Sequence, residues 1–67
     1  MYPELELTIF MSKKSKKEIA SELGMTYNTL LLKLRGKNDF TLDEAVKLKE
    51  ILNTPKSIEE LFTFSAA

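Results

Sequence analysis

A glycine hinge in the middle of the chain constrains the fold more than any other feature. Residues 18–37 read EIASELGMTYNTLLLKLRGK, two short helical patterns separated by Gly24-Met25-Thr26. Each pattern is about two turns long, too short to be stable without packing against other parts of the chain. Three consecutive leucines, Leu30, Leu31 and Leu32, follow the hinge. Successive helical residues point about 100° apart, so one buried face cannot hold all three.

Helix start and stop signals predict five short helices in all. The first begins at Pro3, whose fixed φ suits a first turn, and ends near residues 11–13. Capping boxes, in which serine or threonine precedes glutamate by three residues, follow at Ser15, Thr41 and Ser57. Thr26 is a further N-cap. The remaining expected helices are 16–23, 27–35, one that follows residue 41 and stops at Asn53-Thr54-Pro55, and one that opens at 57 and ends near 62.

Helical spacing selects the apolar residues that face the core. In the first helix these are Leu5 and Ile9, with Leu7 and Phe10 as further candidates. In the later helices they are Ile19, Ala20, Leu23, Leu30, Leu34, Leu42, Ala45, Val46, Leu48 and Leu52, with Lys49 and Ile51 alongside. Phe40, just before a cap, can pack on Ala45 or Val46. The tail FSAA after residue 63 is expected to be loose. The sequence therefore predicts one all-α domain over residues 1–67.

Composition excludes most catalytic and metal chemistry. The chain has 67 residues, enough for one small domain, and contains neither cysteine nor histidine. Disulfides, thiolate or imidazole metal sites and nucleophile–histidine pairs are thereby ruled out. The neighbouring acids Asp43-Glu44 and Glu59-Glu60 begin helices, where capping and the helix dipole explain them. We expect no enzyme activity, no cofactor and no small-molecule substrate. No apolar run approaches the length of a membrane span and the N-terminus is acidic, so a cytoplasmic protein is expected.

Charge is unevenly distributed although the net charge is zero. Residues 12–38 hold seven basic side chains against Glu18 and Glu22, a net charge of +5. Residues 1–11 have a net charge of −2 and residues 39–67 a net charge of −3. A basic middle between acidic ends gives a polyanion a place to dock, because surface asymmetry rather than total charge decides docking. The alternative is an ordinary solvated charge run.

Two short helices joined by a glycine-containing turn form the helix-turn-helix unit, whose second helix presents one face to the DNA major groove. Residues 15–52, SKKEIASELGMTYNTLLLKLRGKNDFTLDEAVKLKEIL, resemble the phage repressor and Cro-type helix-turn-helix family, also called the XRE family. SIEELF at 57–62 resembles that family's closing helix, and YPEL is similar to the opening of small regulators from Gram-positive phages and prophages. The resemblance implies a five-helix, lambda-repressor-like fold with the unit at about 16–35. It also implies operator binding, usually as a homodimer and usually for repression.

The resemblance further implies which residues would touch DNA. In this family the second, third and seventh residues of the recognition-helix segment contact DNA bases. Counted from Thr26 as the first residue, these are Tyr27, Asn28 and Leu32. The Asn28 amide can pair with adenine N6 and N7, or it can be a solvated residue or second cap. Tyr27 can instead pack over the preceding helix. Expected phosphate contacts are Lys16, Lys17, Thr29, Arg35, Lys37 and Asn38.

Two features depart from the family pattern. Lys33 replaces a commonly apolar residue, and its alkyl stem can cover the core while the ammonium reaches solvent. Leu31 and Leu32 stand where polar residues are usual; Leu32 can contact a thymine methyl, or the pair can bind a protein. Alternatively, Leu31 packs on the first helix or on the start of the fourth, and Leu32 is merely exposed. The rival function is therefore a protein-binding helical module such as an antitoxin or antirepressor. A homodimer is expected through the apolar residues of the C-terminal part, namely Ile58, Leu61, Phe62 and Phe64.

Overall fold

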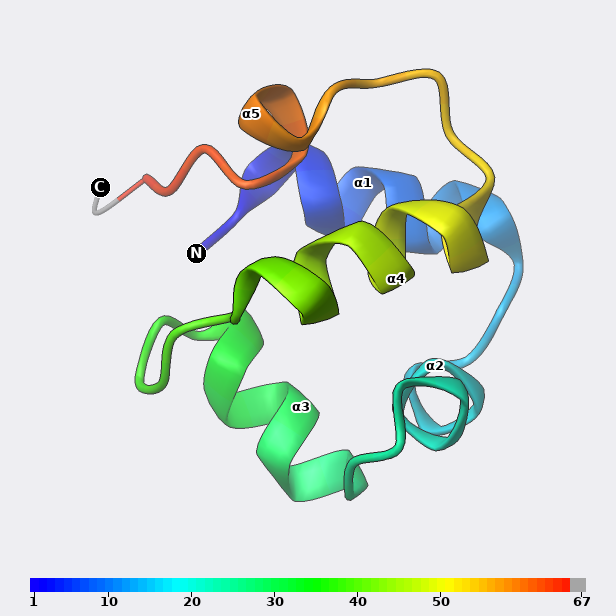
Figure 1. Cartoon of the computed structure of the whole chain (residues 1–67), viewed down its shortest axis with the longest axis vertical. Coiled ribbons are helices and arrows are strands. Elements are labelled where there is room, and N and C mark those ends of the chain that lie inside the picture. The colour runs from blue at the N-terminus through cyan, green and yellow to red at the C-terminus, as the bar shows by residue number, and fades with distance from the viewer. Residues whose placement is uncertain (66–67) are drawn as a thin grey trace.

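Five helices make up the regular structure of residues 1–65, the residues that the computed structural model describes (Figure 1). They are α1 (Pro3–Ser12), α2 (Lys16–Leu23), α3 (Tyr27–Leu34), α4 (Leu42–Leu52) and α5 (Ile58–Leu61). No strand occurs within residues 1–65. The expected all-α class is confirmed, and α3 ends at Leu34, one residue earlier than predicted.

Side-chain caps begin α2, α3, α4 and α5 as the sequence predicted. All three capping boxes form, at Ser15, Thr41 and Ser57. In the first of them, the Ser15 hydroxyl accepts from the Glu18 N–H at 3.1 Å while the Glu18 carboxylate accepts from the Ser15 N–H at 3.2 Å. Thr26 caps α3 by accepting from the Thr29 N–H at 3.1 Å. These caps fix where each helix starts because they satisfy backbone donors that have no partner inside the helix.

Left-handed residues end α1, α2 and α4 and turn the chain. Gly24 closes α2 with φ of 75°, the conformation for which its lack of a Cβ suits it. Lys13 and Asn53 take the same left-handed conformation after α1 and α4, with φ of 63° and 50°. The predicted stop at residues 53–55 is thus confirmed. Of the helices that follow one another in the chain, α2 packs on α3 and α4 packs on α5.

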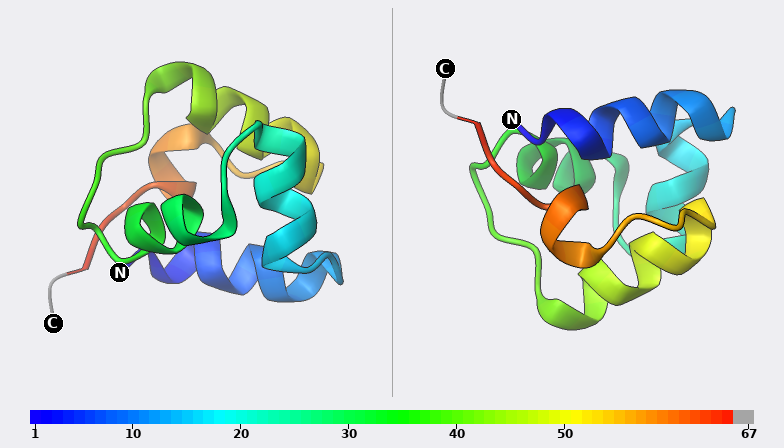
Figure 2. Two further views of the ribbon diagram at one scale, coloured as in Figure 1. Left: turned by 90° about the horizontal axis from the view of Figure 1, so that it is seen from below. Right: turned by 90° about the horizontal axis from the view of Figure 1, so that it is seen from above.

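The core lies where α4 meets its neighbours. Helix α4 contacts α1, α2 and α5, while α2 also packs on α3. Figure 1 shows α2 and α3 at one end of the molecule, with α1 and α5 at the other, and the left view of Figure 2 looks at the end formed by α2 and α3. The buried core consists of Leu5, Ile9, Ile19, Ala20, Leu23, Leu30, Leu34, Leu48, Leu52 and Leu61. Burial of these residues confirms most of the predicted inner faces.

Four expected core residues are instead exposed. On α1, Leu7 is 48% exposed and Phe10 is 82% exposed. On α4, Leu42 and Val46 also lie at the surface. Helical geometry explains α1, because Leu7 and Phe10 point away from the side that carries Leu5 and Ile9. Thr8 takes the remaining inward position and donates its hydroxyl proton to the Glu4 carbonyl at 2.8 Å.

An aromatic cluster joins both chain ends to the loop before α4. Tyr2 packs edge-on against Phe40, Phe62 and Phe64, with ring centroids 5.7, 5.8 and 5.1 Å apart. Phe40, expected to pack on α4, thus has Tyr2 and Phe62 as its ring partners. Ser65 and Met1 exchange two backbone hydrogen bonds of 2.8 and 2.9 Å. The expectation of a loose tail is therefore wrong for residues 64 and 65, while residues 66 and 67 lie outside the described range.

No helix within residues 1–65 is both long enough and apolar enough to cross a bilayer.

Candidate nucleic-acid interface

Helix α3 is held in place by anchors on its inner side. Leu30 and Leu34, one turn apart, are 0% and 2% exposed. Between them, the Lys33 ammonium donates to Glu44 Oε1 at 2.8 Å and to the Asp39 carbonyl at 2.9 Å. The expectation that this ammonium reaches solvent is wrong, because the Lys33 side chain is only 12% exposed. Lys33 instead ties α3 to the start of α4.

The Glu44 carboxylate accepts two hydrogen bonds where α3 meets the start of α4. Its Oε1 completes the α4 capping box by accepting from the Thr41 N–H at 2.9 Å, and it also accepts from Lys33. The hydrogen bond from the Lys33 ammonium, followed by that from the Thr41 backbone, holds the pKa of Glu44 below its ordinary value of 4.5. The carboxylate therefore stays charged at neutral pH and keeps α3 attached to α4.

Three exposed side chains form the outer face of α3. Asn28, Leu32 and Arg35 follow one another at four and three residues, a spacing that places them on one side of the helix. Asn28 and Arg35 are exposed, and Leu32 is 40% exposed. The Asn28 amide forms no hydrogen bond within residues 1–65, since Thr26 provides the cap. Two donors and one acceptor of this amide are therefore available to a ligand.

Tyr27 lies at the border between α2 and α3. Its ring is 40% exposed and lies beneath the Lys17 ammonium, which is 5.8 Å from the ring centroid. This cation–π contact holds the exposed ammonium next to the first turn of α3. Tyr27 therefore packs against α2 and is still open to solvent, so both roles considered from the sequence are compatible with its position.

Thr29 is turned partly inward. Its side chain is half-buried, and its hydroxyl oxygen accepts from the Thr26 hydroxyl at 2.8 Å. Its own hydroxyl proton can still be donated outward. Capping, one of the roles considered for Thr26, is the role it has in the structure.

The fold pairs three of the seven basic side chains of residues 12–38 with carboxylates. Lys14 binds Glu22 at 3.1 Å, Lys16 binds Glu6 at 3.1 Å, and Lys33 binds Glu44 at 2.8 Å. The acidic ends of the chain thus neutralise part of its basic middle. The other four of these seven are exposed and have no carboxylate partner within residues 1–65: Lys13, Lys17, Arg35 and Lys37.

Three of these unpaired cations flank the outer face of α3. Lys17 lies at its N-terminal end through the contact with Tyr27, and Arg35 and Lys37 follow its C-terminal end. Gly36 between them has φ of 81°, and the Lys37 N–H donates to the Leu32 carbonyl at 2.9 Å. This turn closes the chain after Leu34, the last residue of α3. Asn38 is exposed in the following loop.

Lys16 differs from Lys17 because it already has a partner. Its ammonium faces Glu6 of α1, and both side chains remain about one-third exposed. Exposed ion pairs contribute only about 0–1 kcal/mol, so Lys16 can exchange Glu6 for another anion. Two lysines in the first turn of α2 also oppose the helix dipole at a cost of about 0.3–1 kcal/mol each, so helix stability does not explain their presence.

The C-terminal residues expected to form a dimer surface are largely used inside the chain. Leu61 is 0% exposed, and Phe62 is half-buried within the aromatic cluster. Phe64 is partly exposed but packs against Tyr2 and lies over Gly36. The proposed dimer contact through Leu61 is therefore wrong. The apolar residues near the C-terminus were an ambiguous indication of a dimer surface, because such residues can equally cover the chain's own core.

Two features of the structure were not predicted from the sequence. The first is the partly buried Lys33–Glu44 link, which joins residues eleven apart in sequence on two different helices. The second is the apolar side of α1, where residues thought to face the core face solvent. No group of three or more acidic residues within residues 1–65 is placed to hold a metal ion.

No family model matches the chain, and neither a curated protein nor a solved structure matches it.

Proposed function

We propose that the chain is a sequence-specific DNA-binding transcriptional regulator of the phage repressor and Cro type. In this proposal α2 and α3 form the helix-turn-helix of a lambda-repressor-like domain, and α3 enters the major groove. The partner is a double-stranded DNA operator, and the expected site of action is the cytoplasm.

The observation that carries the proposal is the outer face of α3. It presents an unengaged amide at Asn28 on a helix whose inner side is anchored by Leu30 and Leu34. A major groove admits one helix, and an asparagine amide matches the donor and acceptor pattern of adenine. Leu32, one turn further along the same face, is shaped to contact a thymine methyl. A rigidly held helix with these two side chains can read an adenine–thymine step.

Phosphate contacts would come from the unpaired cations on either side. Lys17 precedes the reading face, and Arg35 and Lys37 follow it, so the DNA backbone could be held at both ends of α3. Lys16, Thr29 and Asn38 could add contacts. Such contacts position the protein without reading sequence, and each one releases a counterion.

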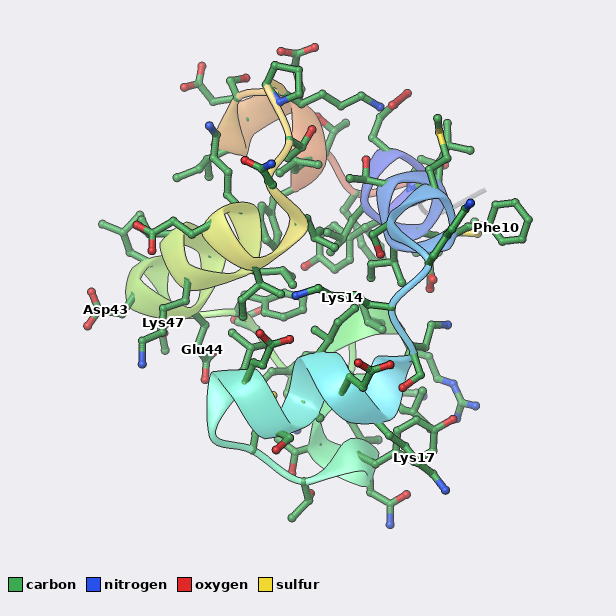
Figure 3. All side chains as sticks on the ribbon, turned by 90° about the vertical axis from the view of Figure 1, so that its right-hand side faces the viewer. Phe10, Lys14, Lys17, Asp43, Glu44 and Lys47 are labelled. Atoms are coloured by element: carbon green, nitrogen blue, oxygen red, sulfur yellow. The ribbon has the colours of Figure 1, made fainter. Side chains whose placement is uncertain are left out.

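Fluorescence anisotropy with DNA selected from a random library tests the proposal through its salt dependence. The logarithm of the association constant should fall linearly with the logarithm of salt concentration, by about 0.9 for each phosphate contact. Replacing Lys17, Arg35 or Lys37 singly by alanine should reduce that slope by about one contact each. Lys47→Ala is the matched control, because Lys47 is an exposed lysine on α4 (Figure 3). A slope unaffected by these variants would refute the proposed phosphate contacts.

One observation favours a second function. Leu32 exposes apolar surface on the outer face, and Leu31 beside it is half-buried. An apolar face of this kind also suits a protein partner, as in an antitoxin or antirepressor that keeps the fold. A salt-independent association, or the absence of binding to any selected DNA, would favour this alternative.

A further inference from the structure

The outward side of α1 carries an apolar stripe that the proposed reading face does not use. Leu7, Phe10 and Met11 are 48%, 82% and 68% exposed. They are three and four residues apart, so they share one side of the helix, opposite to Leu5 and Ile9. Figure 3 shows Phe10 pointing away from the other helices, on the same side of the molecule as Lys17 and opposite to Asp43 and Lys47.

The stripe is comparable in area to the largest apolar patch of a typical single chain, about 300–600 Å². A phenylalanine side chain covers roughly 150–250 Å², so the three residues offer on the order of 300–400 Å² of apolar surface. Contiguous patches of that size on a single chain often mark an interaction site. The hollow beside Met11, of about 270 Å³ and lined also by Thr8, Leu52 and Pro55, extends the surface.

The charges along α1 indicate which partner fits. Glu4 and Glu6 lie in its first turn, and Lys13 and Lys14 follow its last turn. Glu4 and Lys14 are already paired with Lys56 and Glu22, so Glu6 and Lys13 are the charges that a partner can use. Glu6 precedes the stripe by one residue and Lys13, the C-cap residue of α1, follows it by two, so the two charges lie beyond opposite ends of the stripe. Glu6 uses Oε1 for Lys16, which leaves Oε2 free, and Lys13 is exposed.

From this pattern we infer that α1 is the homodimer contact, formed by antiparallel pairing of the stripe with the same stripe on a second copy. Two antiparallel helices crossing near Phe10 place Glu6 of each copy against Lys13 of the other. The same crossing places Phe10 against Phe10 and Met11 against Leu7. The surface is thus complementary to itself, as a two-fold interface requires. The helix dipoles also oppose one another.

This inference rests on the proposed function, because a dimer is needed for specific DNA binding, which usually involves two half-sites. The C-terminal residues cannot supply the whole contact, since Leu61 is buried. An apolar contact of 300–400 Å² per copy is below the size of a stable interface, so the dimer is weak in free solution. Adjacent half-sites on DNA would strengthen it by raising the effective concentration of the two copies.

Cysteine cross-linking tests the pairing directly, because the natural chain contains no cysteine. Phe10→Cys introduces one thiol on the stripe, and Leu42→Cys introduces one at a site on α4 that is 72% exposed. With oxidised glutathione at equal protein concentration, Phe10→Cys should form disulfide dimers at least about tenfold faster, because pairing raises the local thiol concentration. Equal rates for the two variants would overturn the inference.

A charge exchange tests the antiparallel arrangement. Glu6→Lys and Lys13→Glu each place like charges together in their own homodimer, whereas a mixture of the two variants restores every opposite-charge pair. We expect each variant alone to sediment as a monomer at concentrations where the natural chain forms dimers, and the equimolar mixture to dimerise. Thermal unfolding of each variant verifies that it is folded. A mixture that sediments as the two monomers would overturn the antiparallel contact.

Two further results would overturn the inference while leaving the DNA proposal standing. The first is a chain that binds selected DNA but remains monomeric on DNA with two half-sites. The second is a monomeric chain that binds anionic phosphatidylglycerol vesicles and loses that binding with Phe10→Glu, which would assign the stripe to a lipid surface. Conversely, a Phe10-dependent dimer that binds no DNA would support the contact and refute the proposed function.

Discussion

Replacing Lys33 by methionine should destabilise the domain through a single junction. Methionine keeps most of the alkyl stem but removes the ammonium that donates to Glu44 at 2.8 Å and to the Asp39 carbonyl at 2.9 Å. Hydrogen bonds that involve a charged group contribute about 1.5–3 kcal/mol each. Glu44 keeps its bond to the Thr41 N–H and can be reached by water, so we expect a net loss of about 1.5–3 kcal/mol for both bonds together.

Thermal unfolding followed by circular dichroism measures the effect. For a domain of this size, about 1 kcal/mol corresponds to roughly 4–8 °C in Tm, so Lys33→Met should lower Tm by about 6–24 °C. Lys47→Met is the matched control, since Lys47 is an exposed lysine on the same helix as Glu44. That control should change Tm by no more than about 2–4 °C, the effect of a surface substitution of up to about 0.5 kcal/mol.

The pH dependence of the stability difference between the natural chain and Lys33→Met distinguishes loss of the ion pair from a packing effect. The Lys33 ammonium, more than any other group, lowers the pKa of Glu44 from 4.5 in the folded chain. A carboxylate with a lowered folded pKa stabilises the fold above its unfolded pKa, and that stability is lost as pH falls through the folded pKa. The difference between the natural chain and Lys33→Met should be constant near neutral pH and shrink in acid. A difference that does not change with pH, or no difference at all, would refute the account of this junction.

Two further substitutions test how the turns and caps are built. Gly24→Ala and Gly36→Ala should each cost about 1–2 kcal/mol, because both positions have positive φ. Only Gly36→Ala should also shift the NMR signals of the Phe64 and Tyr2 rings, since a Cβ there would lie 2.6 Å from Phe64 Cε1 while nothing lies within 4 Å at Gly24. Ser15→Ala should lower the unfolding free energy by about 1 kcal/mol in urea denaturation, whereas Ser21→Ala, an exposed position inside α2, should not lower it.

Local chemistry explains why the helix boundaries were predictable. Each capping box involves residues three apart, and Gly24 acts through its own backbone, so the signals lie within a few residues of the structure that they determine. Leu30 was identified as a core residue for the same reason, since Leu34 one turn later fixes the buried side of α3.

Long-range contacts explain what the sequence left open. Tyr2, Phe40 and Phe64 meet in one cluster although they are far apart along the chain, and no periodic pattern connects them. The position of Lys33 between α3 and α4 likewise depends on how two helices cross. In α1 the apolar residues are frequent enough to suggest two faces, and only the packing of α4 and α5 decides which one is buried.

The outer face of α3 was predictable in part, because one of its features follows from helical periodicity and another depends on which residue caps the helix. Its periodicity separates Leu30, which is buried, from Leu32, which is 40% exposed, as the three consecutive leucines required. The availability of the Asn28 amide depended on which residue provides the cap, and the hydrogen bonds of Thr26 assign that role.

Selection of bound sequences from random DNA, repeated with Asn28→Ala, tests the central proposal most directly. The natural chain should enrich a site with an adenine at one position of each half-site. Asn28→Ala should lose the preference at that position alone, with a cost of about 1–3 kcal/mol or roughly 5–150-fold in affinity, and keep the others. Uniform weakening at every position would make Asn28 a phosphate contact. Failure of the natural chain to enrich any sequence would contradict the proposed function itself.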